Sequence, residues 1–175
     1  MYRDIVQALC KIFEKNGVLR HFDAESLEKS FKDRSEITFE DFLLEEGIVT
    51  KEELLHALSE FYEKPSLDVE GEFFDHHLVV MFPKDEMLRN LFIPYMRDGD
   101  VLQVVANNPN NNTLSEIIGR YVSYDVTYMV GIARDISDMV EEYYDPSITE
   151  REIDEFNPHE ELEKLHEFDD IVDED

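Results

Sequence analysis

The segment that decides the fold is residues 39–62, which read FEDFLLEEGIVTKEELLHALSEFY. Apolar residues recur there at helical spacing in two series, and Gly47 separates the two series. Gly47 can take the left-handed conformation that ends a helix, and Ile48 can then fold back as the accompanying hydrophobic contact. Thr50 and Glu53 form the capping-box pattern that begins a second helix. The segment therefore predicts a helix hairpin that packs on another surface.

A similar hairpin precedes this one in the sequence. Apolar residues recur at helical spacing over residues 4–16, and Gly17 follows them as Gly47 follows the later series. Asp23 is then expected to cap the next helix, as Thr50 does in the second copy. We interpret residues 1–64 as a duplicated helix hairpin. The alternative is a set of four unrelated helices that share common caps.

Residues 65–144 alternate strand and helix patterns. The clearest strand pair flanks Asp98-Gly99, which is typical of the turn of a β-hairpin. Pro94 cannot donate a hydrogen bond to a ladder, so its strand is expected at a sheet edge or at a bulge. The predicted strands are residues 67–69, 91–96, 101–106 and 122–130. We therefore predict an α+β fold, in which a helical N-terminal subdomain precedes a small mixed sheet of three or four strands with helices packed on it.

Acidic residues dominate the composition. The chain has 16 Lys and Arg against 43 Asp and Glu, a formal net charge of -27. Such a charge repels phosphate backbones and anionic membrane surfaces, which argues against binding to nucleic acid. Residues 145–175 are the most acidic part and carry an apolar stripe at helical spacing. They predict an acidic amphipathic tail that docks either on the body or on a partner.

Cysteine content and hydropathy indicate a cytoplasmic protein. Cys10 is the single cysteine, so an intrachain disulfide cannot form. No apolar run approaches the ~20 residues that span a bilayer, and charges interrupt the N-terminus too early for a secretory signal.

From about Ile37 to Tyr144 the sequence resembles a known family, the N-terminal domain of the type II secretion and type IV pilus ATPases. This domain is also called the general secretory pathway protein E or MshE N-terminal domain. The resemblance rests on pieces in a fixed order: LLEEGIVTKEELLHAL, a helix start at Pro83, FIPY before Asp98-Gly99, then VLQVVANNP, and a closing helix that ends at Tyr144. It implies a helical part followed by an αβ part of three strands with helices.

The resemblance also implies a function. Such a domain regulates a motor and docks on the cytoplasmic domain of an inner-membrane assembly protein. The motor sequence GxxxxGK[ST] does not occur, so we predict no enzymatic activity, whether the chain belongs to a longer ATPase or is a stand-alone relative. The residues chosen as partner-binding candidates flank the second hairpin turn: Glu45, Glu46, Lys51 and Glu52.

Some members of the family bind cyclic di-GMP through a repeated Arg-Leu-Gly element. The matching positions here are Ala8 and Cys10 in the first hairpin and Thr38 and Glu40 in the second, so both arginines and both glycines are missing. Arginine pairs with phosphate or guanine edges, whereas a carboxylate repels phosphate. We therefore expect cyclic di-GMP not to bind, and we keep a receptor with a divergent motif as the alternative.

Two histidine clusters suggest metal binding only weakly, and no cofactor is expected. His159, Glu163 and His166 fall on one face of the tail helix and could hold zinc, which makes a metal-responsive tail a further alternative. Asp75-His76-His77 is better explained by surface or capping residues, because adjacent side chains on a helix point about 100 degrees apart.

Overall fold

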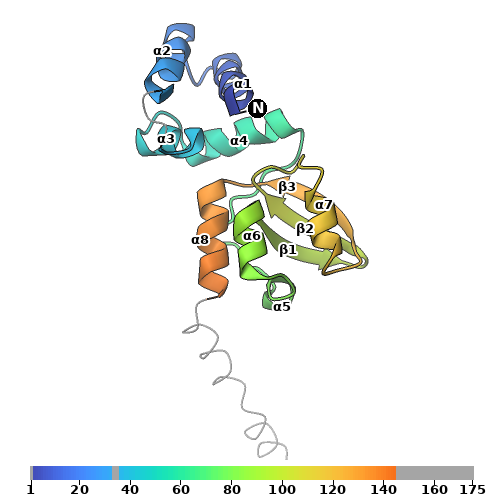
Figure 1. Ribbon diagram of the computed structural model, residues 1–175. Coiled ribbons are helices and arrows are strands. Elements are labelled where there is room, and N and C mark those ends of the chain that lie inside the picture. Colours follow the sequence, from blue (N-terminus) through green and yellow to red (C-terminus); the bar gives the residue numbers. More distant parts are fainter. Residues whose placement is uncertain (1, 33–35, 145–175) are drawn as a thin grey trace, which may run out of the picture. The chain divides into compact units, whose positions relative to one another are not determined.

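A computed structural model describes residues 2–32 and 36–144, and the predicted tail lies outside them. The chain divides into two units, Met1–Val140 and Glu141–Asp175. Four helices come first in the sequence and a sheet with further helices comes after them (Figure 1). The helices are α1 (Tyr2–Lys15), α2 (His21–Lys32), α3 (Phe39–Glu45), α4 (Lys51–Tyr62), α5 (His76–Val79), α6 (Lys84–Asn90), α7 (Leu114–Gly119) and α8 (Ala133–Tyr143).

The two predicted glycine turns have the same geometry. Gly17 and Gly47 both have positive φ, at 73° and 63°. In the second turn the N–H of Ile48 donates to the carbonyl of Leu43 at 2.9 Å, and the first turn contains the equivalent bond from Val18 to Phe13, also at 2.9 Å. This is the Schellman arrangement, and it repeats at the end of α1 and of α3. The capping box of Thr50 and Glu53 at the start of α4 is also present.

One predicted cap is wrong. Asp23 does not precede α2 but lies in its first turn, because the helix begins at His21. The N–H of Asp23 donates to the carbonyl of Arg20 at 2.9 Å, and the Asp23 carboxylate accepts a hydrogen bond from the Arg20 side chain at 2.8 Å. An acidic residue in the first turn of a helix also interacts favourably with the helix dipole. Asp23 therefore does mark a helix start, but the helix begins at His21, three residues earlier than a capping Asp23 would require.

The sheet has three strands in the order β1 (Phe92–Asp98), β2 (Val101–Ala106) and β3 (Asp125–Val130). β1 pairs with β2 antiparallel, and β2 pairs with β3 parallel. Pro94 lies on the edge strand β1, and the register shifts directly after it. The α+β fold with a mixed sheet is therefore confirmed, and so is the expected effect of Pro94.

A fourth strand over residues 67–69 does not form. Within the described part of the chain, Ser66 makes only an isolated parallel bridge to Val130. The Asp68 side chain instead accepts a hydrogen bond from the N–H of Glu70 at 3.1 Å. Such a local turn competes with a strand, so the segment leaves the sheet after a single bridge.

The helical core continues into the sheet. Apolar side chains of α1 to α4 pack in one buried cluster that also contains Val130 and Ile132, which come from the end of β3 and the start of α8. The prediction of separate domains at residues 1–64, 65–144 and 145–175 stays a prediction. The shared cluster brings α3 and α4 next to the start of α8, where the candidate site lies.

Candidate functional site

A cavity of about 760 Å³ opens beside α3, and we call it the Glu40 cavity. Its volume lies within the range of roughly 300–1,000 Å³ that small-molecule sites occupy. Apolar and aromatic side chains form much of its wall, and a few polar groups converge on it. The lining residues are Asp4, Ile5, Leu9, Thr38, Phe39, Glu40, Phe61, Tyr62, Leu91, Asn107, Asn108, Asn110 and Ala133.

Glu40 is the one buried charged residue among those whose burial is described, with 8% exposure. The Asn107 side-chain nitrogen donates to both carboxylate oxygens, at 3.3 and 3.2 Å. The backbone N–H of Ala133 donates to the same carboxylate. Burial raises the pKa of Glu40 to about 7, the charges of Asp41 and Asp135 add to this increase, and the two hydrogen bonds oppose it. The carboxylate therefore titrates near neutral pH.

Another part of the wall is aromatic and amide-rich. The rings of Phe61 and Tyr62 meet edge to face, with 4.8 Å between their centroids. Burial raises the pKa of Tyr62 to about 12, and the charge of Glu40 contributes to this increase. The Asn110 side chain donates to the Tyr62 carbonyl at 3.5 Å, the long limit of a hydrogen bond. The cavity thus offers flat apolar faces beside groups that can donate or accept hydrogen bonds.

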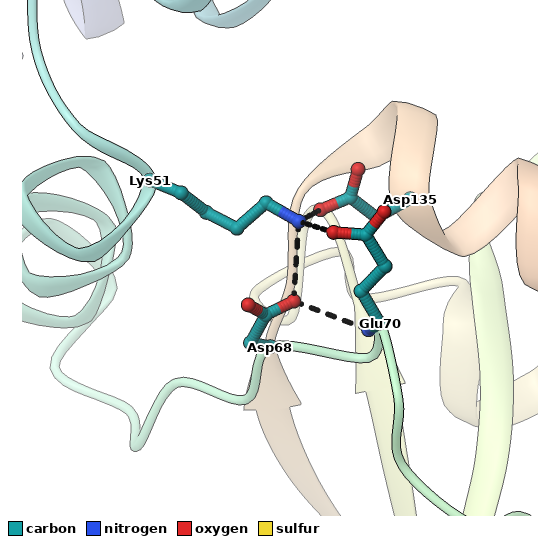
Figure 2. A network of polar contacts seen from close by, with 4 residues as sticks. All are labelled: Lys51, Asp68, Glu70 and Asp135. Carbon is teal, nitrogen blue, oxygen red and sulfur yellow. Dashed lines mark hydrogen bonds and ion pairs between the residues drawn. The ribbon is translucent and has the colours of Figure 1, made fainter.

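A second polar cluster lies at the start of α4 and consists of Lys51, Asp68, Glu70 and Asp135. Figure 2 shows the Lys51 ammonium group pointing toward the three carboxylates. It lies 3.0 Å from Asp135 and 3.4 Å from Asp68, and it also contacts Glu70. Burial works against the Lys51 charge, but the bonds to Glu70 and Asp135 outweigh it and raise the pKa of Lys51. Burial raises the pKa of Asp135 even though Lys51 opposes that shift. Three carboxylates thus share one cation.

The Glu40 cavity and the cluster around Lys51 both include residues that bind the first turn of α8. The N–H of Ala133 binds Glu40 of α3, and Asp135 binds Lys51 of α4. Between them, Arg134 lies 3.6 Å from Glu45 at the end of α3. Three consecutive residues therefore connect α8 to the second helix hairpin. The N–H groups of a first helical turn have no partner within the helix, and here Glu40 supplies one.

The partner-binding candidates chosen from sequence are not equivalent. Lys51 is engaged within the fold and is 28% exposed, and Glu45 contacts Arg134. Glu46 and Glu52 are exposed. Whether any of them binds a partner stays a prediction.

The structure separates the four positions that match the nucleotide motif. Cys10 is buried, and burial raises the pKa of its thiol to about 12, while Ala8 is half-buried on α1. Thr38 and Glu40 both line the Glu40 cavity. The Thr38 hydroxyl also caps α3 by accepting the N–H of Asp41 at 3.1 Å.

Predicted metal ligands fall in two places. His159, Glu163 and His166 lie outside the described residues, so a metal site in the tail stays a prediction. In the described ranges no group of three or more His, Cys, Asp or Glu side chains could hold a metal ion. Asp75 caps α5 by accepting the N–H of His77 at 2.9 Å, in agreement with the capping interpretation.

Within residues 2–32 and 36–144, no helix is both long and apolar enough to cross a bilayer.

Sequence reasoning misses the asparagines of the cavity. Asn107, Asn108 and Asn110 read as a polar loop, and Asn107 lies 67 residues away from its partner Glu40 in the sequence. The run NNPNNN over residues 107–112 is the available signal, because its density of amide side chains exceeds what one turn needs.

The comparisons with known proteins give the family. The MshEN domain matches residues 62–150, which is just over half of the chain. The chain belongs to the MshEN domain family. This confirms the resemblance described from sequence to the N-terminal domain of the type II secretion and type IV pilus ATPases. No curated protein matches the sequence.

Two solved structures are similar to this MshEN domain. One is the structure of MshE with cdg, at 19% identity and a TM-score of 0.61, covering 78% of this chain and 98% of that chain. The other is the N-terminal domain of XpsE, at 14% identity and a TM-score of 0.55, covering 79% of this chain and 94% of that one. At such identities these structures support the fold alone.

One prediction is wrong in the light of these structures. We expected a protein partner and judged cyclic di-GMP, abbreviated cdg, an unlikely ligand, yet the similar MshE structure contains cdg. On sequence alone, Glu40 is a carboxylate that would repel phosphate. In the structure Glu40 is buried, and the Asn107 side chain and the Ala133 N–H donate hydrogen bonds to its carboxylate.

Proposed function

We propose that this MshEN domain binds cyclic di-GMP in the Glu40 cavity, and that it acts as the regulatory domain of a secretion or pilus ATPase or as a stand-alone relative of such domains. The observation that carries the proposal is the position of the cavity. Thr38 and Glu40, the second-hairpin positions that match the family's nucleotide element, both line it.

The composition of the wall supports a nucleotide ligand. Aromatic rings such as Phe61 and Tyr62 can stack on bases, an interaction that is worth about 1–3 kcal/mol for each base. Side-chain amides can donate to phosphate oxygens and to base edges. The described lining contains no Lys, Arg or His, so the phosphates would be held by neutral donors such as Asn108 and Asn110.

The route by which binding would reach the rest of the protein is the start of α8. Glu40 lies in the cavity and holds the Ala133 N–H, so a ligand that engages Glu40 changes a contact at that helix end. α8 continues from Ala133 to Tyr143, past the boundary between the two units at Val140. A ligand contact at one end of a helix is a physical means of regulating the chain at its other end.

Calorimetric titration of cyclic di-GMP into the whole chain tests the proposal. Asn108 and Asn112 are both exposed in the same loop, but only Asn108 lines the cavity. We expect the wild-type chain and Asn112→Trp to bind, and Asn108→Trp to bind at least 10-fold more weakly because its indole occupies the cavity. The wild-type chain should also gain thermal stability with ligand. Absence of both heat and thermal stabilisation at high ligand concentration would contradict the function, and equal binding by the two variants would contradict the location.

A further inference from the structure

We propose that Glu40 selects guanine, because its carboxylate can accept hydrogen bonds from the N1–H and the 2-amino group of a base in the cavity. This inference rests on the proposed function and adds which part of the nucleotide meets which residue. It assigns a role to a carboxylate at the position where the nucleotide-binding relatives are expected to have glycine.

The hydrogen bonding around Glu40 fits a base with two parallel donors. An ionised carboxylate only accepts, and its two oxygens offer about four acceptor sites. Asn107 satisfies both oxygens with a single nitrogen at 3.3 and 3.2 Å, at the long end of the normal range. A two-pronged donor could replace this shared contact with two shorter bonds. The N–H of Ala133 would stay bonded to the carboxylate, but the geometry of this bond would change as the carboxylate adjusts to the base.

Guanine and adenine differ at the atoms that would face Glu40. Guanine presents two adjacent donors, N1–H and the 2-amino group, whereas adenine presents an acceptor at N1 beside its 6-amino donor. Adenine N1 would therefore oppose a carboxylate oxygen. A bidentate contact with a base discriminates by roughly 1–3 kcal/mol, or about 10- to 100-fold in affinity.

Burial orients the remainder of the ligand. Glu40 is 8% exposed, while Asn108 and Asn110 are exposed and mark the side of the cavity that meets solvent. Phosphates placed beside Glu40 would be repelled, and phosphates near the two asparagines would meet amide donors and water. The base therefore points inward and the phosphates point outward. This orientation removes the repulsion that made a carboxylate at this position look incompatible with a nucleotide.

The charges around Glu40 give the contact a pH dependence. Asp41 on α3 and Asp135 on α8 raise its pKa, and Tyr62 on α4 and Asp4 on α1 line the same cavity. Lys51 lies 3.0 Å from Asp135. The ionised form of Glu40 accepts both guanine donors, so affinity should rise between pH 6 and pH 8 as the carboxyl, with its pKa of about 7, loses its proton. A phosphate beside Glu40 would give the opposite trend.

The decisive experiment is a set of calorimetric titrations with cyclic di-GMP, cyclic di-AMP and cyclic di-IMP. The bases of cyclic di-IMP keep the N1–H of guanine but lack its 2-amino group. The wild-type chain should prefer cyclic di-GMP over cyclic di-AMP by at least 10-fold and over cyclic di-IMP several-fold. Glu40→Gln keeps the shape and should lose about 10- to 100-fold in cyclic di-GMP affinity, together with the preference. Glu52→Gln, the same change at an exposed position outside the cavity, should behave like the wild type.

The outcomes separate the two proposals. If the wild-type chain binds cyclic di-GMP and cyclic di-IMP equally, the role of Glu40 is overturned while the proposed function stands, and this comparison needs no variant. Unchanged affinity and preference in a folded Glu40→Gln variant would overturn it as well. If the wild-type chain binds none of the three dinucleotides, the proposed function itself fails and the role of Glu40 fails with it.

Discussion

Glu40 and Lys51 both bind the first turn of α8, but they carry opposite charges and lie in different surroundings. Glu40 is a buried carboxylate whose partners are neutral, the Asn107 amide and the Ala133 N–H. Lys51 is a partly exposed cation surrounded by three carboxylates. Burial moves the pKa of Glu40 into the physiological range, whereas the carboxylates keep Lys51 charged. The first contact can therefore respond to pH and ligand, and the second is a fixed connection.

The largest expected difference between the Glu40 and Lys51 contacts is in how the stability of the chain depends on pH. The pKa of Glu40 is about 7 in the folded chain against 4.5 for an ordinary Glu, so the folded state binds more protons and the free energy of unfolding falls as pH rises between these values. The shift is worth roughly 3 kcal/mol, at 1.36 kcal/mol for each pKa unit. From pH 5 to pH 8, urea unfolding should show the wild type losing roughly 2–3 kcal/mol relative to Glu40→Gln. Parallel pH profiles would contradict the buried state of Glu40.

Removing the amide donor is the next largest change. Asn107→Leu leaves the Glu40 carboxylate with one fewer hydrogen-bond donor, which costs about 2 kcal/mol in unfolding free energy at pH 8. The loss should shrink at pH 6, where the carboxyl is largely protonated. Asn108→Leu serves as the control, because Asn108 is an exposed neighbour in the same loop. Equal effects of the two variants would show that Glu40 does not depend on Asn107.

Lys51→Met should have a smaller effect that responds to salt instead of pH. It leaves Asp135 without its cation, but Asp68 and Glu70 are 43% and 73% exposed, so water compensates much of the loss. We expect a loss of about 1 kcal/mol, reduced in 1 M NaCl and constant from pH 6 to pH 8. Lys11→Met, on the exposed side of α1, provides the reference. A loss that varies with pH as strongly as that of Asn107→Leu would remove the distinction between the two contacts.

The smallest expected effect concerns ligand binding and salt. A chain with net charge -27 repels an anionic dinucleotide over long range, and the described cavity wall supplies no cation. Salt screens this repulsion, so the affinity for cyclic di-GMP should rise a few-fold between 50 and 300 mM NaCl in calorimetry. Affinity that falls with salt, as when phosphates pair with Lys or Arg, would place the phosphates elsewhere.

The parts of the fold that sequence predicted are those that local chemistry determines. Gly17 and Gly47 need only their own turns, and the capping box of Thr50 needs only Glu53 three residues later. The strand expected at residues 67–69 failed because Asp68 forms a local turn and also bonds to Lys51.

The site could be predicted only in part, because its decisive property, the burial of Glu40, depends on tertiary contacts. Thr38 and Glu40 are recognisable as the motif positions, but nothing next to Glu40 in sequence indicates that it is buried. Its partners Asn107 and Ala133 come from the other half of the chain, and only folding removes its carboxylate from water. The sequence shows the charge of Glu40 but not its surroundings.

The most direct test of the account is an NMR titration of the isotope-labelled chain with cyclic di-GMP. Ligand that meets Glu40 displaces the Asn107 side chain and perturbs the Ala133 N–H, so we predict large shifts of these two resonances at saturation. The backbone resonances of Asp68 and Glu70, beside Lys51, should move little. Saturable binding that leaves Asn107 and Ala133 unperturbed, or no shift anywhere in the spectrum, would contradict the claim that the Glu40 cavity is the ligand site.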